Sequence, residues 1–198
     1  MVTLLAATSV IAGVICKRMC SFYYTARKRF GPFCGEPWTA YASWAGLTDV
    51  KELISFDEIL CPNLIENLTD EDWKHNVQAD NRVFWFIDFD YLKKRVRFDS
   101  ALHNILAIAE NTEHWTPPSE FMHRGFDIID SYDNISILTN CRGGFGDTMV
   151  GLKLNSYGLV DSLETAESIA YDLRRSFPDE AHCKTCRAIS LAQHVKGK

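Results

Sequence analysis

Alternating apolar and polar residues predict strands in several separate parts of the chain. Residues 20–30 alternate aromatic side chains with smaller or polar ones, as a strand with one buried face does. Residues 82–91 are dense in aromatic and branched side chains and predict a second strand, on which Asp88 and Asp90 share one face. Shorter apolar runs predict buried strands at residues 104–109, 126–129 and 135–138.

Helical periodicity is clearest in residues 161–177. Asp161 and Glu164 have the spacing of an N-terminal cap, apolar residues recur at three- and four-residue steps, and Pro178 ends the pattern. Ser55 and Glu58 have the spacing of a capping box, which predicts a short helix before Pro62. The acidic residues 69–72 suit the first turn of another short helix, because the helix dipole is positive there.

Two further segments complete the pattern. Glycines and prolines in residues 31–37 predict a loop that carries the aromatic residues up to position 44. Residues 186–195 fit either a final strand or a short helix. With no internal repeat and no low-complexity linker, the chain is predicted to form a single compact α+β domain at residues 19–198, with a mainly antiparallel sheet and helices packed on it.

The first 18 residues are interpreted separately, because residues 2–16 form an uncharged apolar run. A signal peptide has its basic residues before the apolar stretch, whereas Lys17 and Arg18 follow it here. The run is also shorter than the about 20 residues that cross a bilayer. We favour an N-terminal extension or loosely attached helix at residues 1–18 over membrane association or a signal peptide.

Composition and charge narrow the class of protein. Of the 198 residues, 46% are apolar and 24% are charged, which is typical of a globular domain and argues against a disordered chain. The formal charge of −5 argues against a nucleic-acid partner, because phosphate recognition needs a basic surface. The same charge suits a basic protein partner. Seven cysteines, an odd and dispersed set, indicate reduced thiols and a cytoplasmic setting.

Two sets of residues are weak candidates for catalysis. Asp88 and Asp90 offer the carboxylate oxygens that a divalent cation prefers, although polar residues also commonly end a strand at the surface. Cys141 precedes a glycine-rich stretch whose amides suit an oxyanion, and His123 is one of several histidines that are candidates for its base. A structural role for the cysteine is the favoured interpretation.

A zinc site is the third candidate. Cys183 and Cys186 form a single C-x-x-C pair, and His194 could add a ligand, with Cys141 as a further one. No second C-x-x-C pair is present to complete a tetrahedral site. The expectation is therefore a protein without a cofactor, with structural zinc as the alternative.

The favoured function is that of a small intracellular protein that binds a partner without catalysing a reaction, as an inhibitor or a bacterial immunity protein does. Aromatic side chains make good interface anchors, and carboxylates suit a basic partner. The candidate partner-binding residues are Trp38, Trp44, Trp73, Trp115, Asp130 and Asp133. The alternatives are an enzyme that uses Cys141 or the aspartate pair, and a structural module that uses the C-terminal cysteines to hold zinc.

Overall fold

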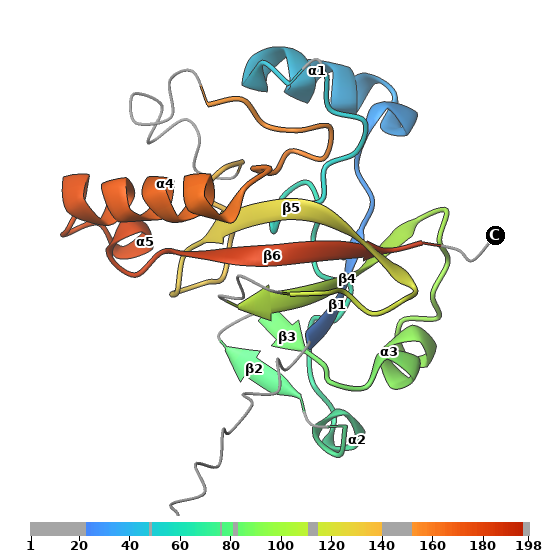
Figure 1. The fold of residues 1–198 in the computed structure, drawn as a ribbon. Coiled ribbons are helices and arrows are strands. Elements are labelled where there is room, and N and C mark those ends of the chain that lie inside the picture. The colour runs from blue at the N-terminus through green and yellow to red at the C-terminus, as the bar shows by residue number, and fades with distance from the viewer. Residues whose placement is uncertain are drawn as a thin grey trace, which may run out of the picture.

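A four-stranded antiparallel sheet forms the centre of the fold (Figure 1). The computed structural model describes residues 23–47, 49–75, 77–80, 83–110, 115–139 and 152–195. The strands lie in the order β1-β4-β6-β5. Their bounds are Tyr23–Lys28 for β1, His103–Glu110 for β4, Phe121–Ile129 for β5 and Arg187–His194 for β6. The sheet and the helices packed on it confirm a single α+β domain.

The smaller elements surround this sheet. A hairpin of β2 (Gln78–Asp80) and β3 (Val83–Trp85) joins its β1 edge through a bridge between Phe86 and Tyr24. The helices are η1 (Pro32–Cys34), α1 (Glu36–Ala45), α2 (Asp70–Trp73), α3 (Phe89–Arg95), α4 (Leu163–Ser176) and α5 (Ala181–Lys184). None of these described helices has the length and apolar composition that a membrane span needs.

Both faces of the sheet are buried, which explains why its central strands are nearly continuous apolar runs. On one face, Leu106 and Ile108 of β4 pack in the same cluster as Phe56 and Leu159. The other face is divided between two clusters. The residues that pack around Phe86 and Leu92 are Ala26, Ile105, Ala107 and Ala192. Helix α4 covers the part formed by β5 and β6, as Figure 1 also shows.

The C-terminal elements largely match their predictions. Helix α4 is confirmed, with Ala166, Ala170 and Leu173 buried, although its N-cap is Ser162 in place of Asp161. The Ser162 hydroxyl accepts the Thr165 backbone N–H, as a serine cap does. Residues 187–194 resolve the open alternative at the C-terminus as strand β6.

Two predictions between β1 and β4 were wrong. The loop expected at residues 31–44 contains helix α1, because Pro37 lies in the first turn, where a missing N–H costs nothing. Residues 55–58 do not start a helix. Asp57 instead accepts the backbone N–H groups of Ile59 and Leu60 in a turn, and the Ser55 hydroxyl bonds to that of Thr139.

Two predicted strands are shorter than expected. Strand β3 ends at Trp85, and Asp88 accepts the Tyr91 N–H as the N-cap of α3. Asp88 and Asp90 therefore do not share a strand face. Within residues 135–138, one bridge from Ser136 to Ile129 takes the place of the expected strand. The predictions for residues 1–18 lie outside the described residues.

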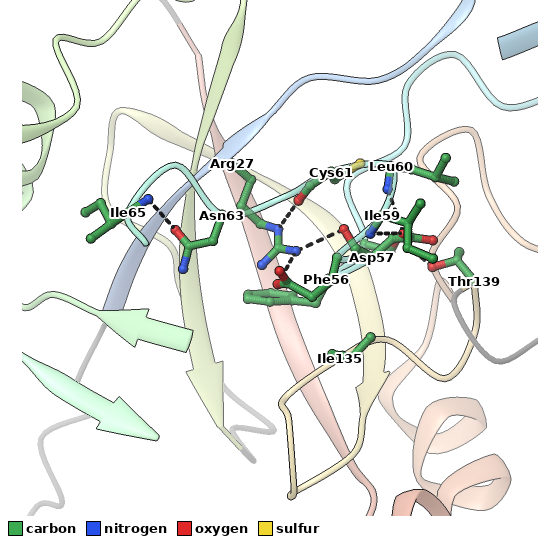
Figure 2. A network of polar contacts seen from close by, with 12 residues as sticks. Arg27, Phe56, Asp57, Ile59, Leu60, Cys61, Asn63, Ile65, Ile135 and Thr139 are labelled. Atoms are coloured by element: carbon green, nitrogen blue, oxygen red, sulfur yellow. Dashed lines mark hydrogen bonds and ion pairs between the residues drawn. The ribbon is translucent and has the colours of Figure 1, made fainter. Parts of the chain in front are cut away.

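Arg27 fastens the segment of residues 56–61 to the sheet (Figure 2). Its side chain is 1% exposed, and its Nε donates to the Cys61 carbonyl oxygen at 2.7 Å. Nη2 donates to the Asp57 carbonyl and to the Glu58 carboxylate, while the guanidinium lies 4.7 Å from the centre of the Phe56 ring. A buried charge needs such partners, so this segment has a defined path across the sheet.

Candidate functional site

An exposed aromatic side chain on a fixed helix marks one candidate site. Trp73, at the end of α2, has 55% of its surface exposed, and Ile87, in the segment before α3, has 49% exposed. Asp70 and Glu71 are exposed on the same helix, and Asp90 is exposed at the start of α3. We call these five residues the α2 surface. Apolar side chains among carboxylates suit a partner that has both apolar and basic groups.

The buried carboxylate of Asp72 fixes α2 in place. It accepts hydrogen bonds from the Thr69 backbone and hydroxyl, the Tyr91 hydroxyl and the Arg95 guanidinium. Burial alone would raise the pKa of Asp72, but these donors together lower it to about 2. The α2 surface is therefore attached to α3 by an ionised group that stays charged over the physiological range.

His75 joins the two helices a second time. Its ring stacks on the Tyr91 ring with centroids 3.6 Å apart, and its Nδ1 lies 3.1 Å from the Asp88 carboxylate. The backbone N–H of Tyr91 and the hydrogen bond with His75 lower the pKa of Asp88. Asp90 instead pairs with Lys93 at 2.9 Å. These partners give each of the two aspartates a structural role that the sequence did not predict.

A second candidate site is the polar network at the end of the sheet where β1 finishes. The Glu52 carboxylate accepts hydrogen bonds from Nε and Nη2 of Arg29, Nδ2 of Asn104 and Nε2 of Gln193. Gln193 also donates to the Asn104 side-chain oxygen at 2.8 Å. Glu52, Asn104 and Gln193 are all less than 10% exposed. Four donors satisfy both carboxylate oxygens, so the charge can remain in a buried position.

Sequence reasoning missed this network, although one signal was available. Asn104 and Gln193 are polar residues within otherwise apolar strands, and such residues need buried partners. Pairing of β4 with β6 sets Leu106 opposite Gln193, which brings Gln193 close to Asn104. The sequence does not show the register of two distant strands. The hydrogen-bond partners of Asn104 and Gln193 could therefore not be predicted from it.

The remaining predicted partner-binding residues lie in different settings. Trp44 is 68% exposed on α1, whereas Trp38 is 6% exposed and packs against the Phe30 ring. Trp38 therefore contributes to the core and offers little surface to a partner. Trp115 is half-buried, and its ring meets that of His123 edge to face.

The two predicted acidic residues of the β5 turn also differ. Asp130 is fully buried, and its carboxylate accepts the backbone N–H groups of Tyr132, Asp133 and Ile135. It therefore shapes the turn and presents no surface. Asp133 is half-buried.

His123, the candidate base, faces a hydroxyl. Its Nε2 lies 2.9 Å from the Ser190 Oγ, and partial burial lowers its pKa. Ser190 is 3% exposed, so its hydroxyl is closed to a substrate, whereas His123 itself is exposed on β5. Cys141 lies outside the described residues.

The candidate zinc ligands in the described part of the chain do not converge. Cys183 and Cys186 are buried, and the Cys186 thiol donates to the Ala170 carbonyl. Cys186 directly precedes β6 and His194 ends it, which separates the two residues by roughly 25 Å at the rise of a strand. His194 therefore cannot complete a site with this pair. Within the described residues, no group of three or more His, Cys, Asp or Glu side chains could hold a metal ion.

Comparison of the chain with family models, with curated proteins and with solved structures finds no match in any of the three. The geometry described above therefore has to support any functional conclusion by itself.

Proposed function

We propose that this protein binds a basic protein partner through the α2 surface, as an inhibitor or immunity-type protein does, and catalyses no reaction of its own. The observation that carries the proposal is the exposed Trp73 side chain on a helix that Asp72 holds in place. An exposed tryptophan is a common anchor of protein interfaces, because burying it removes a large apolar area from water.

Preorganisation supports the same proposal. Fixing a flexible side chain or loop on binding costs free energy, and a helix already held by its neighbours avoids much of that cost. Tyr91 and Arg95 of α3 hold α2 through Asp72, and Asp88 holds it through His75. Trp73 is thus presented on a surface that is ordered before a partner arrives.

Charge supports the basic character of the partner. The chain carries a formal charge of −5, and the exposed carboxylates of Asp70, Glu71 and Asp90 lie on the α2 surface. Lys74 and Lys93 pair with Glu71 and Asp90, so a basic partner would exchange these local pairs for intermolecular ones. Such contacts speed association and weaken as salt is added.

The proposal includes a cytoplasmic setting. In the described part of the chain, Cys34, Cys61 and Cys186 are free thiols. Free thiols persist in the reducing cytoplasm, which supports this setting.

The test is a quantitative capture experiment with the immobilised full-length chain and a lysate of its native host. Partners are identified by mass spectrometry, and the purified partner is then titrated by calorimetry. We expect Trp73→Ala to weaken binding at least tenfold, because a tryptophan anchor accounts for much of an interface's free energy. Affinity should also fall as the salt concentration rises from about 50 to about 500 mM, while the stability of both proteins stays about the same.

Tyr171→Ala is the matched control. Tyr171 is 58% exposed, close to the exposure of Trp73, but lies on α4 and should leave binding unchanged. Equal losses from the two variants would refute a specific α2 surface. A loss with Trp44→Ala and none with Trp73→Ala would move the interface to α1 and also refute it. Chemical conversion of the captured partner by the wild-type chain would refute the proposal that the protein catalyses no reaction.

A further inference from the structure

Two hollows adjoin at the end of the sheet, and none of the residues that line them belongs to the α2 surface. The larger has a volume of about 480 Å³ and includes Glu52 and Asn104 of the polar network in its wall. The smaller has a volume of about 350 Å³. Arg29, Ala101 and His103 line both, so one ligand can extend from the first into the second.

The wall of the larger hollow presents donors. Both oxygens of the Glu52 carboxylate already accept two N–H groups, so this residue has no strong acceptor site left. Arg29 uses three of its five N–H groups, two toward Glu52 and one toward the Ser100 carbonyl oxygen. Nδ1 of His103 accepts the Asp99 backbone N–H, which leaves the proton of the neutral ring on Nε2.

The smaller hollow is apolar. Phe33, Cys34, Leu64 and Leu102 line it, and the Arg29 guanidinium lies 4.7 Å from the centre of the Phe33 ring. Phe33 is 53% exposed and Leu102 is 61% exposed. A ligand that covered these two side chains would remove apolar surface from water, which is a favourable contribution to binding.

The charged side chains that line the two hollows sum to one positive charge when the histidines are neutral. Arg29 and Lys28 are cationic, and Glu52 is the anionic residue among those that line the hollows. A monoanion complements this charge better than a dianion or a cation does. The two N–H groups that Arg29 does not use toward Glu52 and Ser100, one on Nη1 and one on Nη2, can donate to a ligand carboxylate.

We propose that the two hollows form one binding site for a small apolar carboxylic acid, with its carboxylate at Arg29 and His103 and its hydrocarbon part between Phe33 and Leu102. The site is separate from the α2 surface, so its test is independent of the proposed protein partner. Octanoate is the probe, and octanamide is its uncharged counterpart of nearly the same shape.

The experiment measures alkylation of Cys34 by iodoacetamide in the folded, full-length chain, because Cys34 lines the apolar hollow. Peptide mapping by mass spectrometry separates Cys34 from the other cysteines. We expect 10 mM octanoate to slow the reaction of Cys34 at least fivefold, with half-maximal protection at about 1 mM or below, as expected for a ligand of this size. Octanamide should need a concentration at least tenfold higher.

Two variants locate the effect. Leu102→Glu places a negative charge at the apolar hollow and should abolish protection. Ile59→Glu is its matched control, because Ile59 is 80% exposed and does not line either hollow. Both replace an exposed aliphatic side chain with the same carboxylate, so each should remain folded, and Ile59→Glu should keep wild-type protection.

Several results would overturn the proposal. Absence of protection by octanoate would refute binding of a small apolar acid. Equal protection by octanamide would refute the role of the carboxylate. Protection that survives Leu102→Glu, or is lost with Ile59→Glu, would show that octanoate does not bind in these two hollows. Protection by an acetylated tripeptide ending in leucine at a concentration tenfold below that of octanoate would assign the site to a chain terminus instead of a small acid.

Discussion

The Arg29 guanidinium holds the Glu52 carboxylate through two hydrogen bonds, with Nε 2.6 Å from Oε1 and Nη2 3.2 Å from Oε2. Residues 23 positions apart are thereby joined at the end of the sheet. Glu52 is 9% exposed and Arg29 is 26% exposed as side chains, so this pair is screened by water less than a surface pair would be. The contact connects the loop after α1 to the segment that follows β1.

Replacing Glu52 should destabilise the protein strongly. Glu52→Ala leaves the Arg29 charge without its counterion and removes the acceptor of Asn104 and Gln193, so we expect a loss of about 3 kcal/mol in the free energy of unfolding. Urea unfolding followed by circular dichroism measures this. Glu71→Ala is the control, because Glu71 forms an exposed ion pair with Lys74 and its loss should leave the urea midpoint unchanged. Equal effects from both variants would contradict the role assigned to the network.

Asp127 should make stability depend on pH. Burial raises the pKa of Asp127 to about 6, although the Ser136 hydroxyl and the backbone N–H groups of Phe56 and Ile128 oppose the shift. The folded state therefore binds a proton more tightly than the unfolded state, whose pKa is about 3.9. The stabilising contribution of this proton is fully present below the unfolded pKa and is lost as pH rises through 6.

The measurement compares wild type with Asp127→Asn by urea unfolding from pH 4 to pH 7. A gap of about two pKa units corresponds to about 3 kcal/mol in full. Because pH 4 is already close to the unfolded pKa, wild type should lose about 2 kcal/mol relative to the variant over this range. The difference between the two proteins isolates Asp127 from the other titrating groups. A difference that stays constant from pH 4 to pH 7 would contradict the raised pKa.

Local signals in the sequence predicted part of this fold well. Helix α4 has regular apolar spacing, a side-chain cap and a following proline, so its residues could be identified from the sequence within a few positions. Helix α1 was missed because Gly35 and Pro37 suggested a loop, although a proline in the first turn is compatible with a helix. The aromatic run of residues 82–91 concealed the change from β3 to α3, which Asp88 marks as an N-cap.

The candidate sites depended more on contacts between distant residues. Trp73 was identified because large aromatic side chains make useful anchors, but the sequence did not distinguish it from the buried Trp38. Exposure is set by which face of each helix meets the core. The network of Glu52 with Asn104 and Gln193 joins three segments, and only the pairing of β4 with β6 brings the two amides together.

A glycine at the irregularity in β5 should be difficult to replace. Gly125 has φ of +138°, and a Cβ added there would lie 2.7 Å from the Val160 carbonyl oxygen. Gly46 also has positive φ, at +65°, but a Cβ there would meet nothing within 4 Å. Gly46→Ala should therefore cost about 1 kcal/mol for its backbone conformation alone.

Gly125→Ala should cost at least about 3 kcal/mol, because the backbone strain is joined by a clash with main-chain atoms that cannot move easily. Thermal unfolding of both variants gives the comparison. Equal melting temperatures for Gly125→Ala and Gly46→Ala would mean that β5 and the segment around Val160 are not packed as closely as described.

The four described cysteines should differ widely in reactivity. Cys34 is half-buried, whereas Cys61, Cys183 and Cys186 are at most 2% exposed. Burial raises the pKa of the Cys61 and Cys186 thiols, so less of the reactive thiolate is present at neutral pH. With iodoacetamide at pH 7.5, we expect Cys34 to react at least tenfold faster than the other three. In 8 M urea the four rates should converge, because the protection comes from the fold. Rapid alkylation of Cys61 in the folded protein would show that residues 56–61 open easily, in contradiction to the hydrogen bonds that Arg27 makes with them.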